Sequence, residues 1–137
     1  MTRRAFPLVL VALALVLSAC KVDTTVTVQV RDSDLPRRYH FVNDIVPLLS
    51  RFGCNSSGCH GKAEGQNGFK LSVFGFDPVA DYQALVMESR GRRLFLTSTA
   101  NSLLLLKASG RVAHGGGKRL AADSLPYARL HRWIVEG

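Results

Sequence analysis

"RFGCNSSGCHGK", residues 51–62, carries the motif around which the rest of the sequence can be interpreted. Cys54 and Cys59 are separated by four residues, and His60 directly follows the second cysteine. Two thiols and an adjacent imidazole are compatible with a covalently attached haem, with a zinc site, or with a disulfide beside an uninvolved histidine. The spacing and the rest of the chain decide which of the three is favoured.

The order of these residues is typical of c-type haem attachment, in which two thiols bond the macrocycle and the next residue binds iron. The usual spacer has two residues, so a four-residue spacer must form a loop, and "NSSG" favours turns. Zinc motifs usually combine two separated pairs of ligands, and only one pair exists here. A disulfide across so small a ring stabilises little by closure. We therefore favour haem attachment through Cys54 and Cys59, with His60 as an iron ligand.

Residues 1–19 have the pattern of a secretory signal. Arg3 and Arg4 precede an apolar run that is too short for a comfortable transmembrane helix, and "LSAC" ends at Cys20. This ending resembles the lipobox of bacterial lipoproteins, in which the cysteine is lipidated and becomes the N-terminus. We predict export and lipidation at Cys20, which would anchor the protein on the periplasmic side of a membrane; an ordinary signal peptide is the alternative.

The composition limits the partners. The formal net charge is +8, to which Arg3 and Arg4 of the signal contribute, and the rest of the chain is long enough for one domain. A basic exported protein favours acidic partners or anionic membrane surfaces. Export, and the lack of a pattern of basic and aromatic residues, argue against nucleic acid. The predicted partners are a redox protein and the membrane that holds the lipid anchor.

The helical period dominates from residue 39 onward, after a segment (20–38) that holds the predicted lipidated N-terminus, a short strand or tether at 24–30 and a charged linker. Helices are predicted over 41–52, 77–91, 101–110 and 124–136, and an extended loop or short strand over 68–76. Asp77 and Ser124 are the expected N-caps. The leucines at 103–106 indicate burial on nearly all sides. The prediction is an all-α domain over residues 39–137.

A second iron ligand can be sought among Met87, His40, His114 and His131. Small c-type cytochromes take this ligand from a loop before the C-terminal helix, where His114 stands, followed by three glycines that allow close approach of the backbone. Met87 lies mid-helix, where methionine is usually packing material. His131 lies on the last helix, and His40 has no supporting feature. We predict His114, with a plain surface histidine as the alternative.

Four segments together resemble, in order, the planctomycete-type cytochrome c domain: "FVNDIVPLLSRFGCNSSGCHG", "GFKLSVFGFDPVADYQAL", "SLLLLKASGRVAHGGGKRL" and "LHRWIV". The resemblance covers about residues 41–136. It implies a haem c bound by Cys54, Cys59 and His60 in a cytochrome c-like helical fold. Related cytochrome domains carry a Met-Pro-Pro segment where "AHGGG" stands here, which favours His114 as the substitute ligand. Many members continue into larger domains. This chain is therefore expected to be either a stand-alone cytochrome or an abbreviated relative of a larger protein.

The sequence thus predicts a membrane-anchored, exported monohaem c-type cytochrome. Bis-histidine ligation by His60 and His114 would lower the reduction potential relative to a thioether ligand. It would also close the iron to substrates, so electron transfer is expected rather than enzymatic chemistry. Two alternatives stay open: a haem enzyme or sensor with an open iron position, and a non-haem scaffold domain with a Cys54–Cys59 disulfide.

Overall fold

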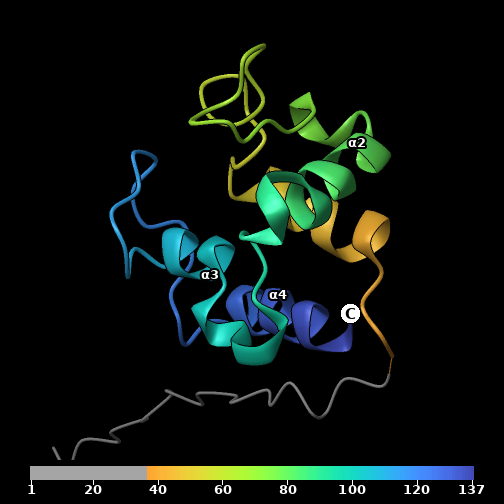
Figure 1. Cartoon of the computed structure of the whole chain (residues 1–137), viewed down its shortest axis with the longest axis vertical. Coiled ribbons are helices and arrows are strands. Elements are labelled where there is room, and N and C mark those ends of the chain that lie inside the picture. The colour runs from red at the N-terminus through yellow and green to blue at the C-terminus, as the bar shows by residue number, and fades with distance from the viewer. Residues whose placement is uncertain (1–36) are drawn as a thin grey trace, which may run out of the picture.

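The computed structural model describes residues 37–137, and this part of the chain is all-α, as predicted (Figure 1). It contains four α-helices and no β-strand: α1 (Val46–Arg51), α2 (Pro78–Tyr82), α3 (Leu103–Ala108) and α4 (Leu125–Glu136). The predicted signal peptide, the lipidation at Cys20 and the strand at 24–30 lie outside the described residues. Within residues 37–137, none of the helices has the length and apolar character needed to cross a bilayer.

The first predicted helix is present, although its opening turn is wound differently. Residues Phe41–Ile45 form a π-helical turn that continues into α1. Pro47 is the second residue of α1, at the point where the π-helical turn passes into the α-helix. Gly53 follows with φ +70°, a conformation that glycine adopts without strain. The Cys54 N–H then bonds to the Leu49 carbonyl at 2.9 Å, so α1 leads directly into the cysteine motif.

The predicted helix over 77–91 is shorter than expected. Asp77 is its N-cap, as predicted, and its side chain accepts the Ala80 N–H at 3.0 Å. The α-helix ends at Tyr82, and a π-helical turn (Gln83–Met87) and a 3-10 turn (Glu88–Gly91) follow. Three residues of that last turn, Ser89, Arg90 and Gly91, adopt positive φ, which ends the helical path. The α-helical part is therefore only five residues long, much shorter than the predicted helix.

Residues 68–76, predicted as an extended loop or short strand, contain no strand: residues 70–72 form a loop without regular structure, in which Ser72 is extended, between a turn and a 3-10 turn. Their one β-type pairing is an isolated bridge between Gln66 and Phe69. A 3-10 turn (Val73–Gly75) comes next, and the buried Asp81 of α2 holds it by accepting the Ser72 N–H and, at 2.8 Å, the Ser72 hydroxyl. This carboxylate competes with strand formation by taking the backbone N–H that a neighbouring strand would need.

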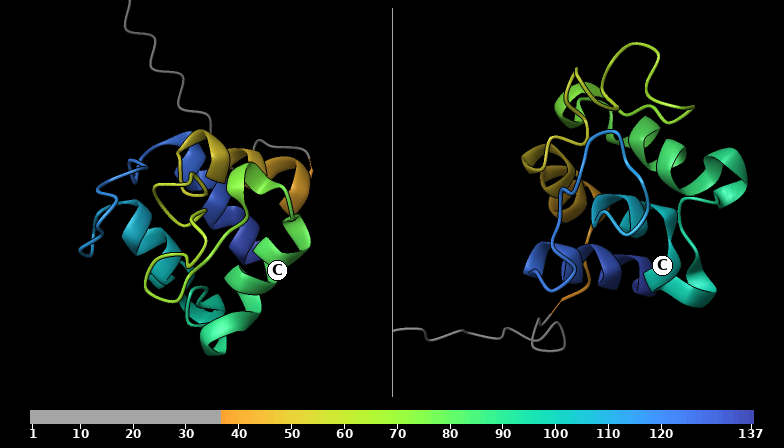
Figure 2. Two further views of the ribbon diagram at one scale, coloured as in Figure 1. Left: turned by 90° about the horizontal axis from the view of Figure 1, so that it is seen from above. Right: turned by 90° about the vertical axis from the view of Figure 1, so that its left-hand side faces the viewer.

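The core lies where α4 packs against α3, the 3-10 turn Leu96–Asn101 and the opening π-helical turn. Ser124 is the N-cap of α4, as predicted. The Glu136 carboxylate accepts the Tyr39 N–H at 2.9 Å, which ties the start of the described chain to its end. From two further directions, Figure 2 shows the loop between α3 and α4 leaving this core beside the cysteine-containing loop. The largest fully buried apolar side chains are Ile45, Leu49, Leu71, Leu85, Leu105, Leu130 and Ile134.

Candidate functional site

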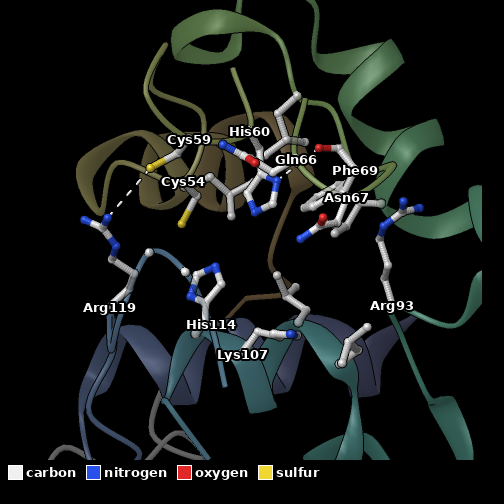
Figure 3. Close-up of a pocket in the computed structure, with 18 of the residues that line it drawn as sticks. Cys54, Cys59, His60, Gln66, Asn67, Phe69, Arg93, Lys107, His114 and Arg119 are labelled. Atoms are coloured by element: carbon white, nitrogen blue, oxygen red, sulfur yellow. Dashed lines mark hydrogen bonds between the residues drawn. The ribbon is translucent and has the colours of Figure 1, made fainter. Parts of the chain in front are cut away.

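A cavity of about 480 Å³ opens between the cysteine motif, the turn that follows it, α3 and the glycine-rich loop (Figure 3). Its lining includes Cys54, Cys59, His60 and His114, the four residues that the sequence nominated for haem. The structure therefore brings together residues from both halves of the domain. The rest of the wall is largely apolar and includes Leu49, Phe69, Leu71, Leu85, Leu103, Leu104 and Ala108.

The four-residue spacer is a compact turn and not an open loop. The His60 N–H donates to the Cys54 carbonyl at 3.0 Å, which closes the ring of residues between them. Asn55 is only 1% exposed, and its side-chain amide donates to the Ser50 hydroxyl at 2.9 Å. A Cβ at Gly61 would lie 2.2 Å from the Asn55 carbonyl oxygen, so the backbones approach too closely for any other residue. This packing fixes the two cysteines and His60 relative to one another.

The His60 ring is held by a backbone carbonyl. Its Nδ1 lies 3.0 Å from the Phe69 carbonyl oxygen, and because a carbonyl only accepts, Nδ1 must carry the proton. Burial lowers the pKa of His60, which outweighs the opposing effect of the Phe69 carbonyl, and the charges of His114 and Arg93 act in the same direction as burial. The ring is therefore neutral, with the lone pair on Nε2, the form that binds metals.

His114 is held in the same way from the opposite side of the cavity. Its Nδ1 lies 2.9 Å from the Gly117 carbonyl oxygen, while the Gly117 N–H donates back to the His114 carbonyl at 2.8 Å. Gly117 has φ +71°, which this tight turn requires. A Cβ at Gly116 would lie 3.1 Å from the His114 ring and would crowd it. The glycines thus shape the turn and leave space for the imidazole.

The two imidazoles form a matched pair. Their ring centroids are 6.2 Å apart and their planes differ by 9°. Figure 3 shows the His60 and His114 rings entering the same space from opposite sides. Each uses Nδ1 for a carbonyl, and neither Nε2 has a hydrogen bond among the residues that the structure describes. Nε2 atoms on opposite sides of one gap are placed so that both could bind a single metal ion.

The thiols lie at one end of the cavity, near Arg119 (Figure 3). Cys54 and Cys59 are both free. Burial raises the pKa of the Cys54 thiol to about 11, and the nearby Arg119 charge opposes this rise only in part. Arg119 also donates to the Cys59 sulfur at 3.7 Å. Both sulfurs are therefore available for bonding to a ligand that fills the cavity.

The lining carries positive charge. Arg92, Arg93, Lys107 and Arg119 line the cavity, and no Asp or Glu among residues 37–137 does. Such a wall favours a ligand with anionic groups.

The other candidate ligands lie elsewhere. Met87 is 69% exposed, and His40 is also exposed. His131 stacks on Tyr127, with ring centroids 6.5 Å apart, and does not line the cavity. Within residues 37–137, no group of three or more His, Cys, Asp or Glu side chains could hold a metal ion by itself.

Three residues of the site were not predicted from the sequence: Phe69, Arg93 and Arg119. Phe69 contributes a backbone carbonyl, which leaves no signal in the sequence. Arg119 stands directly after the glycine-rich loop, so its proximity to His114 in the chain was the available hint. Arg93 follows another arginine between two predicted helices, where no site residue was predicted.

A comparison with protein-family models finds no match to this sequence, and the comparisons with curated proteins and with solved structures find none either.

Proposed function

We propose that this protein is an exported, lipid-anchored monohaem c-type cytochrome that carries single electrons. His60 and His114 are the axial iron ligands in this proposal, and Cys54 and Cys59 attach the haem. The bound haem supplies the one-electron redox chemistry, and the chain holds, orients and shields it. The resemblance of residues 41–136 to the planctomycete-type cytochrome c domain agrees with this assignment.

The geometry of the two imidazoles carries the proposal. Two metal–nitrogen bonds of about 2.0–2.1 Å, with each nitrogen about 1.1 Å from its ring centre, place coaxial rings about 6.2–6.4 Å apart. The observed centroid separation is 6.2 Å, and the planes are nearly parallel. The backbone carbonyls that hold both Nδ1 atoms leave Nε2 as the ligand atom on each side.

The lining also fits the other groups of a haem. Each thiol would add across a vinyl group: the S–H bond breaks, an S–C bond forms, and the hydrogen goes to the second vinyl carbon, without net oxidation. The leucine-rich wall would suit the flat apolar macrocycle. Arg92 and Lys107 are the lining cations that would suit its two carboxylates, because Arg119 lies at the thiol end and Arg93 donates to two backbone carbonyls. With both iron faces occupied by imidazole, no position is left for a substrate, so electron transfer is favoured over catalysis at iron.

The absorption spectrum of the protein matured in a haem-attaching host tests this function. The proposal predicts a low-spin spectrum in both oxidation states and no change on exposure to carbon monoxide. A high-spin resting spectrum with tight carbon monoxide binding would instead indicate an enzyme or sensor with an open iron position. Absence of haem, with a disulfide joining Cys54 and Cys59, would indicate the scaffold domain.

The membrane anchor is a separate part of the proposal. It depends on Cys20 and the signal-like residues before it. Metabolic labelling with a radioactive fatty acid should label the protein, and Cys20→Ser should abolish the label and release the protein from the membrane fraction. A labelled Cys20→Ser variant would contradict lipidation at this position.

A further inference from the structure

Arg93 is a buried cation in the lining of the proposed haem site. In the chain it lies between the 3-10 turns Glu88–Gly91 and Leu96–Asn101; it lines the cavity, and it is only 5% exposed. Nη1 donates to the Ala84 carbonyl and Nη2 to the Gly68 carbonyl, both at 2.6 Å. The Glu88 carboxylate lies 3.8 Å away, but its side chain is 55% exposed and compensates the buried charge only partly. A charge in this position is costly to bury, which calls for a reason beyond packing.

The contacts of Arg93 lead to His60 through Phe69. The guanidinium carbon lies 4.5 Å from the centre of the Phe69 ring, and the Phe69 ring centre lies 4.5 Å from that of His60. Figure 3 shows Phe69 between the two. The carbonyl of this same Phe69 holds His60 Nδ1. Arg93 therefore fixes the residue that orients the imidazole, through the ring on one side and the preceding Gly68 carbonyl on the other.

The backbone at this point needs such support. Asn67 and Gly68 both have positive φ, at +51° and +72°. Consecutive left-handed residues are unfavourable when the first carries a side chain, so local propensity alone does not hold the turn. Two neutral hydrogen bonds between Gln66 and Phe69 close it, and the charged donor of Arg93 adds the stronger third.

We infer that Arg93 is a positioning residue for the His60 imidazole and a fixed positive charge that favours the reduced state of the haem. This inference rests on the proposed function. Reduction adds one negative charge to the site, so a nearby buried cation stabilises the reduced form more than the oxidised form. The two roles are separable, because lysine keeps the charge but cannot reproduce the planar two-armed guanidinium that reaches both carbonyls.

The test compares Arg93→Met and Arg93→Lys holoprotein with wild type, and with Arg129→Met as the control for loss of an exposed arginine that does not line this cavity. At a fixed electrode potential, Arg93→Met should lower the ratio of reduced to oxidised protein about tenfold, which is ~59 mV for one electron. Arg93→Lys should keep most of this ratio, and Arg129→Met should change it less than about twofold. Unchanged ratios in both Arg93 variants would overturn the electrostatic role.

The positioning role has its own measurement. In ¹⁵N NMR spectra, the His60 Nδ1–H should exchange slowly with water in wild type and Arg129→Met. This hydrogen should exchange rapidly in both Arg93 variants. If Arg93→Met does not fold, Arg93→Lys alone provides the test. Slow exchange in the folded Arg93→Lys variant would overturn the positioning role. Because this hydrogen can be observed in haem-free protein, a wild type that carries no haem would refute the proposed function while the test of His60 positioning still gives a result.

Discussion

Gly75 is the position at which a single methyl group should test how the cysteine motif is packed. Its φ is +78°, and a Cβ built on it would lie 2.2 Å from Cγ1 of Val46 and 3.8 Å from the side-chain nitrogen of Asn55. The neighbouring Phe74 N–H donates to the Asn55 carbonyl at 3.3 Å. Gly75→Ala would therefore push the turn away from both α1 and the spacer of the cysteine motif.

Two costs add in Gly75→Ala. A left-handed backbone costs a residue with a Cβ about 1–2 kcal/mol. The overlap with Val46 must be relieved by displacement in a packed region, which typically costs about 1–3 kcal/mol. The variant should therefore lose about 2–5 kcal/mol of unfolding free energy. Gly91→Ala is the matched control: its φ is +67°, but the nearest atom to its Cβ, the Val86 carbonyl oxygen, is at an ordinary 3.5 Å.

The assay is urea-induced unfolding followed by circular dichroism, for which stability falls linearly with urea concentration. Gly91→Ala should lose only the backbone cost of about 1–2 kcal/mol, so the two variants should differ by about 1–3 kcal/mol. Equal losses in Gly75→Ala and Gly91→Ala would refute the close approach to Val46. A loss below about 0.5 kcal/mol in both would refute the strained backbone as well.

Three further predictions concern the iron ligand, the core and the pH dependence. His114→Ala should keep covalent haem but become high-spin and bind carbon monoxide or added imidazole; an unchanged low-spin spectrum would exclude His114 as a ligand. Leu105→Ala, at a position with 0% exposure, should cost about 2–5 kcal/mol by urea unfolding, whereas Leu96→Ala, at 67% exposure, should stay within about 0.5 kcal/mol. Hydrogen bonding to Arg37 holds the pKa of Asp44 below its usual value, so its contribution is complete above the unfolded-state pKa of about 4 and is lost as pH falls through the folded-state pKa. Asp44→Asn should be less stable than wild type near neutral pH, and the two urea midpoints should converge in acid; a constant difference would contradict this.

The helices were predictable where local chemistry marks their ends. Asp77 and Ser124 cap their helices through side-chain oxygens, and Gly53, with positive φ, comes just after α1. Gly91 also has positive φ, but it ends a 3-10 turn and not α2, which stops at Tyr82. The winding inside them was not predictable. The π-helical turns shift backbone hydrogen bonds by one residue, which residue propensities do not indicate. The 3-10 turn within 68–76 was not predicted either, because Asp81, in another element, holds Ser72 at its start.

The candidate site was predictable as residues and not as geometry. The adjacency of Cys59 and His60 nominated the ligands, and three glycines nominated His114. The two rings belong to segments that are far apart in the chain, so their 6.2 Å separation depends on how those segments pack together. The backbone carbonyls of Phe69 and Gly117 orient the rings. Because every residue has a backbone carbonyl, the sequence does not indicate which ones will hold a ring. The inward-facing Asn55 also differs from the solvent loop that turn propensity suggested.

Covalent attachment of haem through Cys54 and Cys59 can be measured by whether the haem stays with the protein after denaturation. Protein matured in a haem-attaching host is unfolded in detergent, separated from free haem, and measured as the reduced pyridine complex, with Cys54→Ala/Cys59→Ala as the control. One haem per chain should stay with the unfolded wild type and should be lost from the control. Wild-type protein that releases its haem, or never acquires one, would contradict it.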